Sequence, residues 1–125
     1  MNLDDLTLGQ AKQLAAMFAG GAQPVAQIPG NNRPVIVRSR DAGVQFGELV
    51  EYAADGSTVT LARARQLWKW KARQGGTLLD CAQHGVNKVG SKFSGPCDRV
   101  IVLGACAIID CTPDSVSSIE AVSWS

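Results

Sequence analysis

A strand–turn–strand pattern around an Asp-Gly pair constrains the fold of this chain more than any other feature. Residues 46–52 place Phe46, Glu48 and Val50 on one face of a strand and the residues between them on the other. Residues 58–61 form a second strand-like run after the turn at 54–57. Asp-Gly suits a tight hairpin because both residues adopt positive φ at low cost. β-Branched residues at 35–37 add a strand before this hairpin. The stretch 34–61 therefore predicts a meander of three antiparallel strands.

Residues 62–73, with the sequence ARARQLWKWKAR, combine basic and aromatic side chains. This window holds five of the twelve Lys and Arg residues and two of the three tryptophans. As a strand it would carry on one face Arg63, Arg65, Leu67, Lys69 and Lys71, and on the other Gln66, Trp68 and Trp70. A helix would separate these residue types less well. We therefore expect a strand with one basic face and one face that carries both tryptophans.

The following residues predict a short helix, a loop and a buried strand pair. A helix over 77–83 can begin at the capping residue Thr77 and end at Gly85. Residues 86–98 lack periodicity, which is typical of a loop. The run 100–111 is almost wholly apolar and predicts strands that are buried on both faces around Gly104.

A last helix is predicted over 112–122, with Thr112 as its cap and Pro113 at its first position. The fold class expected from these elements is α+β, in which a mainly antiparallel sheet dominates and the helices are short. Trp124 follows near the end of the chain.

The first 32 residues differ from the rest in their pattern. Thr7 and Gln10 match a capping box, and an apolar stripe follows at helical spacing up to Phe18. Glycine, proline and asparagine then dominate residues 20–33, as in a linker. We expect a helical anchor with its linker over 1–32 and a β-rich ligand-binding core over 33–125. The anchor could fold back on its own core or dock on a neighbouring subunit.

The composition indicates a protein that self-associates and works in the cytoplasm. Charged residues make up 18% of the chain, below the ~25% of soluble domains, and the net charge is +1. The sequence has no long apolar run for a membrane span and an acidic rather than basic start. The four cysteines, Cys81, Cys97, Cys106 and Cys111, lack paired spacing. We expect them to be reduced, buried thiols, and no metal site.

Few residues could support catalysis. The sole histidine, His84, comes before Gly85 at an expected helix end, and the acid pair Asp4-Asp5 comes at an expected helix start. Nucleotide-hydrolase and dinucleotide-binding motifs are missing from the sequence. We therefore expect a binding protein without a cofactor, rather than an enzyme.

Basic residues with aromatic neighbours suit a nucleotide ligand, because arginine binds phosphate and an aromatic ring stacks on a base. The residues with this chemistry are Arg38, Arg40, Phe46, Arg63, Arg65, Trp68, Lys69, Trp70, Lys71 and Phe93. Core packing for the tryptophans and a solvated face for the cations are the structural alternatives.

Several stretches resemble a known family. They are PVIVRSRDAGVQFGELVEY, TVTLARARQLWKW, TLLDCAQHGV and KFSGPCDRVIVLGACAIIDCT, which together span roughly residues 34–124. They are similar to the Thoeris anti-defence family of small phage proteins. Lys69 stands where the family has a tyrosine between two tryptophans, and the stretch that begins Asp98-Arg99-Val100 is less acidic than the family pattern.

The resemblance implies a protein that binds cyclic ADP-ribose isomers made by host defence enzymes and sequesters them uncleaved. It also implies a homo-oligomer, a dimer or hexamer, with ligand between subunits, and in some members a further pocket for cyclic oligonucleotides. The ligand-binding residues expected here are Arg38, Arg40, Phe46, Arg65, Trp68, Trp70, Asn87, Lys92, Phe93 and Arg99. An enzyme that degrades the same signal, and a structural or DNA-binding phage protein, are the alternatives.

Overall fold

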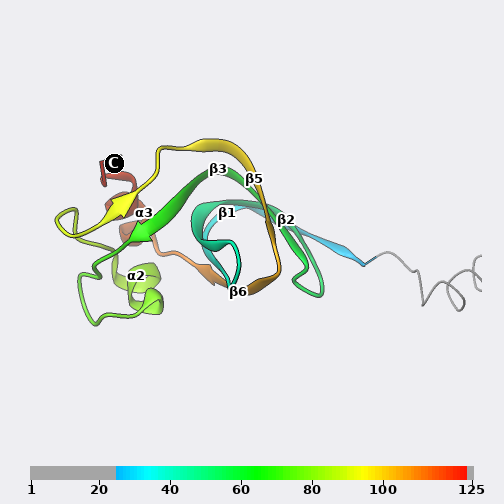
Figure 1. Ribbon diagram of the computed structural model, residues 1–125, viewed down its shortest axis with the longest axis horizontal. Helices are drawn as coiled ribbons and strands as arrows, with labels where there is room; N and C mark the ends of the chain where they lie inside the picture. Colours follow the sequence, from blue (N-terminus) through cyan, green and yellow to red (C-terminus); the bar gives the residue numbers. More distant parts are fainter. Residues whose placement is uncertain (1–24, 124–125) are drawn as a thin grey trace, which may run out of the picture.

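The computed structural model describes residues 25–123 (Figure 1). Its strands are β1 (Gln27–Ser39), β2 (Gly43–Ala53), β3 (Thr58–Lys69), β4 (Lys92–Phe93), β5 (Cys97–Leu103) and β6 (Ala105–Asp110). Its helices are α2 (Leu78–His84) and α3 (Pro113–Glu120). The prediction of a mainly antiparallel sheet with short helices is confirmed for this part of the chain. The helical anchor, including Leu14 and Phe18, and the last tryptophan, Trp124, lie outside the described residues.

The strands close into a small barrel. β1 pairs with β2, β2 with β3, and β3 with β5, all antiparallel. The chain then bends at Gly104 (φ 67°) and continues as β6, which pairs antiparallel with β1. The bend lies against the β2–β3 turn, where the Gly104 N–H donates to the Ser57 carbonyl over 2.9 Å. β4 extends the sheet beyond β5 by pairing with the end of β3.

The predicted meander is confirmed, and so is its turn. Gly56 has φ 78°, and the Ser57 N–H donates to the Asp55 carboxylate over 2.9 Å. This bond explains why aspartate suits the position. Hydrogen bonding to the Ser57 side chain, and then to its N–H, lowers the pKa of the Asp55 carboxyl.

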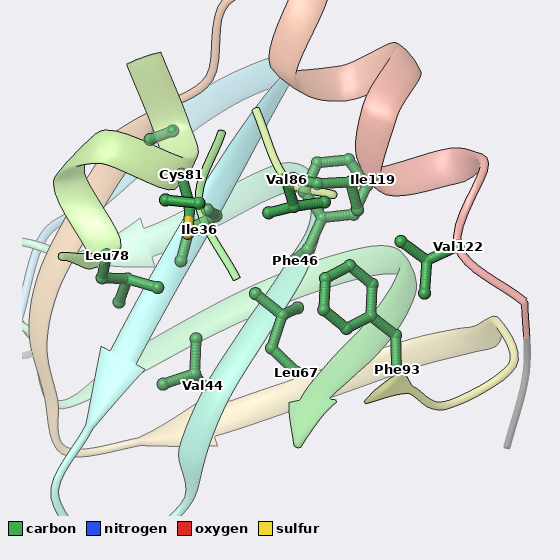
Figure 2. Close-up of a cluster of buried hydrophobic side chains, with 12 residues drawn as sticks. Ile36, Val44, Phe46, Leu67, Leu78, Cys81, Val86, Phe93, Ile119 and Val122 are labelled. Atoms are coloured by element: carbon green, nitrogen blue, oxygen red, sulfur yellow. The ribbon is translucent and has the colours of Figure 1, made fainter. Parts of the chain in front are cut away.

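The three long strands separate two hydrophobic cores. The barrel core contains Val35, Val37, Leu49, Val59, Leu61, Ala64 and Val102. The helix-side core lies on the opposite face and packs the strands against α2 and α3 (Figure 2). Ile36 belongs to it, whereas its neighbours in β1 belong to the barrel core. This alternation follows from the two-residue period of a strand.

Both predicted helix starts are confirmed. The Thr77 hydroxyl accepts from the Asp80 N–H, and the Asp80 carboxylate accepts from the Thr77 N–H, which completes a capping box. The Asp80 carboxylate accepts bonds from the Thr77 N–H, the Thr77 hydroxyl and the Gly76 N–H, and these bonds lower the pKa of the Asp80 carboxyl. The Thr112 hydroxyl caps α3 at the Ser115 N–H over 3.2 Å. α2 ends at Gly85 as expected, and α3 ends at Glu120, two residues earlier than predicted.

β1 begins inside the segment that we expected to be a linker. Its pairing with β2 reaches back to Gln27 and is interrupted by an irregularity between Pro29 and Arg33. Asn31 and Asn32, both with φ 58°, take up this irregularity. The turn-forming residues therefore form a bulge within a strand and not a break between two units.

Bulges also change which side chains of β3 share a face. In the pairing with β2, one extra residue of β3 lies at Arg63 (φ 48°). In the pairing with β4, another lies at Trp68, between the two β3 residues that pair with β4. Each bulge reverses the alternation of side chains. Arg65 consequently points into the helix-side core while Trp68 is exposed, and Trp70 packs against that core. The expected division into a basic face and a tryptophan face is therefore wrong.

Two further expectations need correction. The segment 86–98 holds β4 and the start of β5 and is not only a loop. β5 is not buried on both faces, since Ile101 and Leu103 are 46% and 63% exposed while Val102 is buried. Only one face of β5 meets the barrel core, and the helices cover a different part of the sheet.

The cysteines are free thiols in two environments. Cys81 is buried and Cys111 is half-buried, and burial raises the pKa of these thiols to about 11 and about 12. Cys97 and Cys106 are exposed, so the expectation of four buried thiols is wrong for these two. Among residues 25–123, no cluster of three or more His, Cys, Asp or Glu side chains could hold a metal ion. Neither helix of this part of the chain is long and apolar enough to cross a membrane.

Candidate functional site

An exposed tryptophan marks the end of β3. Trp68 is 70% exposed, and the Lys92 ammonium lies 5.7 Å from the centroid of its ring. The bulge at this position turns the indole outward, and the pairing of β4 with β3 brings Lys92 beside it. A hollow of about 250 Å³ adjoins the ring and is lined by Gln66, Trp68, Phe93 and Ser94. A flat indole that lies open next to a cation suits stacking on a planar, anionic ligand.

A larger cavity lies farther along the same chain segment. Its volume is about 870 Å³, within the ~300–1,000 Å³ of typical small-molecule sites. It is lined by Lys71, Arg73, Val86, Asn87, Lys88, Val89, Gly90, Asp114, Ser117, Ser118 and Ala121. It lies at the end of the molecule where α2, α3, β4 and the end of β3 gather (Figure 1).

Backbone hydrogen bonds hold two walls of this cavity together. The Asn87 N–H donates to the Lys71 carbonyl over 2.8 Å, and the Arg73 N–H donates to the Gly85 carbonyl over 2.9 Å. α3 supplies the third wall, where the Ser118 hydroxyl accepts from the Val86 N–H over 2.9 Å. The cavity is therefore built on paired backbone.

The surface around both hollows is cationic. Lys71, Arg73 and Lys88 line the cavity together with a single acid, Asp114. Lys69 pairs with Lys92 across β3 and β4 and adds charge between the hollows. Lys71 follows Trp68 by three residues, just beyond the end of β3 at Lys69. No ion pair between residues 25–123 engages these five cations.

Arg65, one of the expected ligand residues, has another role in the structure. It is 5% exposed, and its guanidinium donates to the carbonyls of Ser94, Ile119 and Val122 over 2.6, 2.9 and 2.9 Å. Burial lowers the pKa of this guanidinium, and the Glu120 carboxylate opposes that effect. The side chain caps the end of α3 and fixes the β4–β5 connection, so all three of its nitrogens already donate to the protein itself.

The comparisons with known proteins fit this core of strands and helices. A family model described as a domain of unknown function, DUF6948, matches residues 32–119, which run from β1 to α3. The chain belongs to the DUF6948 family. No curated protein and no solved structure matches it.

The DUF6948 domain brings together only part of the expected ligand set. Trp68 and Lys92 lie together, and Asn87 lines the large cavity. Phe46 and Phe93 are buried in the helix-side core, and Trp70 is half-buried against it. Their rings are therefore engaged in packing.

Three expected arginines lie outside both hollows of the DUF6948 domain. Arg38 is exposed on β1, Arg40 is exposed beside the β1–β2 turn, and Arg99 is exposed on β5, paired with Ala62. None of them lines the hollow at Trp68 or the large cavity. The structure thus separates them from the surface that joins Trp68 to Lys71.

The cavity cations Arg73 and Lys88 were missing from the expected set, although both are basic. The sequence offers one indication of them, because Gly85 and Gly90 flank the short segment that carries Asn87 and Lys88. Both glycines have positive φ, and a side chain at Gly90 would press on the stem of Lys71 at 3.2 Å. Glycine there allows the segment to approach β3 and form the cavity wall.

Proposed function

We propose that this protein binds a small nucleotide with phosphate groups and holds it without cleaving it. The observation that carries the proposal is an exposed indole, at Trp68, on the same chain segment as a cavity lined by three cations. The base would stack on Trp68, and the phosphates would reach Lys71, Arg73 and Lys88.

Exposure of Trp68 supports a stacking role. A tryptophan that is 70% exposed contributes little to the core, and its ring borders a hollow that Gln66, Phe93 and Ser94 also line. Stacking of a base on an aromatic side chain contributes about 1–3 kcal/mol. The Lys92 ammonium beside the ring would add attraction for a phosphate near the base.

The polar groups of the cavity suit a phosphate-bearing sugar. Charge-assisted bonds from lysine and arginine are about twice as strong as neutral ones, which offsets the cost of burying phosphate. The Asp114 carboxylate and the Ser117 hydroxyl line the same cavity and could accept bonds from ribose hydroxyls. The cavity thus offers separate partners for the charged and the neutral parts of one ligand.

The resemblance to Thoeris anti-defence proteins narrows the proposed ligand to cyclic ADP-ribose isomers, with cyclic oligonucleotides as a second class. The protein would then act in the host cytoplasm during phage infection as a stoichiometric sponge. It would block Thoeris immunity by sequestering cyclic ADP-ribose isomers, and it would block CBASS, another host defence system, by sequestering cyclic oligonucleotides. A sponge needs no nucleophile or metal, since its effect depends on affinity and abundance alone.

Calorimetric titration with cyclic ADP-ribose, ADP-ribose and ATP tests the binding site. Trp68→Ala is expected to weaken binding about 5- to 150-fold, the equivalent of one lost stacking contact. Leu103→Ala is the matched control, because it removes an exposed apolar side chain on β5. Lys88→Ala should weaken binding while Arg40→Ala should not. Equal affinity of all four variants and the wild type would contradict the proposed site.

The same preparation distinguishes a sponge from an enzyme. The protein is incubated with the bound nucleotide and denatured by heat, and the released compound is identified by chromatography and mass spectrometry. Intact cyclic nucleotide is expected, whereas a hydrolysed product would overturn the proposal. A DNA-binding protein would instead bind oligonucleotides with an affinity that falls steeply as salt is raised.

A further inference from the structure

A side-chain amide borders the hollow at Trp68 without a partner of its own. The hollow is lined by Gln66, Trp68, Phe93 and Ser94. The Ser94 hydroxyl is engaged, because it accepts from the Gln66 N–H over 2.8 Å and donates to the Gly95 carbonyl over 2.9 Å. The exposed Gln66 amide makes no hydrogen bond with any residue between 25 and 123. Its oxygen and its nitrogen are therefore open to a ligand.

Backbone pairing holds Gln66 in place on both sides. Its carbonyl accepts from the Ser94 N–H over 2.9 Å, just after β4. On its other side it pairs with Gln45 of β2. The backbone of Gln66 is therefore fixed, and its side chain is the part that is left to meet a ligand.

The Gln66 amide extends toward the level of the indole. Its nitrogen lies 3.6 Å from the point where a side chain at Gly43 would begin, and no other segment of the chain comes within 4 Å of that point. The pairing of β2 with β3 places Gly43 level with Trp68. Lys92 lies beside the ring on the opposite side, since β4 and β2 flank β3. A base stacked on Trp68 would therefore have an ammonium near one edge and an amide near the other.

An amide in this position favours one base over others. It offers one donor and one acceptor side by side, and adenine presents the matching pair at its N6 amino group and N7. Hypoxanthine and guanine carry a carbonyl in place of the amino group, so the amide oxygen would face a second acceptor. We propose that Gln66 selects adenine among the bases that can stack on Trp68. This inference rests on the proposed function and deepens it, because it assigns the choice of base to one side chain.

Calorimetric titration with two matched ligand pairs tests the selection: cyclic ADP-ribose with cyclic inosine diphosphate ribose, and ATP with ITP. The members of a pair carry the same phosphates and differ at position 6 of the purine. In whichever pair binds, the wild type is expected to bind the adenine member about 5- to 150-fold more tightly. Gln66→Met keeps the length of the side chain without its amide and should lower this ratio about fivefold or more. Gln83→Met is the matched control, since Gln83 is exposed on α2 and lines neither hollow.

A stacking variant separates this inference from the proposed function. Trp68→Ala should weaken both members of a pair by the same factor, because every base has a face that can stack on an indole. Circular dichroism of each variant confirms the fold. If the wild type binds none of the four ligands, both proposals are overturned. If Trp68→Ala weakens binding but the wild type does not prefer adenine, or Gln66→Met keeps the wild-type ratio, only the role of Gln66 is wrong.

Discussion

The two cores lie on opposite faces of the same strands but are held together by different means. The barrel core is aliphatic, and backbone pairing closes the strands around it. The helix-side core mixes aromatic, aliphatic and thiol side chains, and it depends on helix caps and on the buried guanidinium of Arg65. The candidate ligand site borders the second core only.

This difference explains where a binding site can form. A closed barrel leaves few backbone groups and side chains free to vary, because each strand is constrained by two neighbours. On the helix side, the bulge at Trp68 and the positive φ of Gly85 and Gly90 turn side chains and backbone outward. The barrel thus gives a rigid support, and the irregular end of β3 carries the chemistry.

The largest predicted effect is on the helix-side core. Phe93→Ala should lower the free energy of unfolding by about 3–5 kcal/mol, because Phe93 is fully buried in the helix-side core and the Arg65 guanidinium lies 5.5 Å from the centroid of its ring. Urea denaturation followed by circular dichroism measures this change. Trp68→Ala is the control, since the same kind of side chain is removed from an exposed position and stability should change by less than about 0.5 kcal/mol. Equal losses in the two variants would show that the Trp68 side chain is part of the core.

The second prediction concerns Arg65 as the link between β3 and α3. Arg65→Met keeps most of the side-chain volume but removes the guanidinium bonds to three carbonyls, of which only that of Ile119 keeps another donor, the Val122 N–H. This loss should cost about 3 kcal/mol of unfolding free energy. Arg63→Met, two residues earlier, removes an exposed arginine that pairs with Glu48 and should cost at most about 1 kcal/mol. Denaturation of both variants compares them. If Arg65→Met were as stable as Arg63→Met, the buried guanidinium would not hold α3 in place.

These two arginines also show what could and could not be predicted from the sequence. The Asp-Gly turn, the caps at Thr77 and Thr112 and the strand through residue 69 follow from local rules, and the structure has all of them. The bulges at Arg63 and Trp68 do not follow from the local sequence. They decide which arginine is buried and which aromatic side chain is exposed. A prediction based on the regular alternation of side chains in a strand therefore assigned them to the wrong faces.

The site was predicted less well than the fold because it depends on distant segments. Arg65 bonds to carbonyls 54 and 57 residues later, and the cavity joins residues 71–73, 86–90 and 114–121. No spacing within the sequence indicates that these segments meet. Trp68 and Lys92 were expected to contribute to one site on chemical grounds, and the β3–β4 pairing brings them together.

The last prediction uses the two thiols of the helix-side core, since the seven buried residues of the barrel core carry no ionisable group. The pKa of Cys81 is raised from 9.0 to about 11, and that of Cys111 from 9.0 to about 12, in both cases mainly by burial. The folded state therefore holds these protons more tightly than the unfolded state does. The contribution of these protonated thiols to the free energy of unfolding is fully present below pH 9. It is lost as the pH rises from 9 toward 11 or 12, at about 1 kcal/mol per pH unit for each thiol.

Denaturation between pH 8 and 11 should show this decline in the wild type and a shallower decline in the Cys111→Ala variant, whose folded state has one fewer buried thiol. Cys106→Ser is the control, because Cys106 is exposed and its replacement should leave the slope unchanged. Amide protection factors, in which the base-catalysed rise of the intrinsic exchange rate is divided out, should fall first in α2 and α3 and later in the barrel strands, because the buried thiols lie on the helix side. A uniform fall in protection, or equal slopes in the three proteins, would show that the two cores unfold as one unit under alkaline conditions.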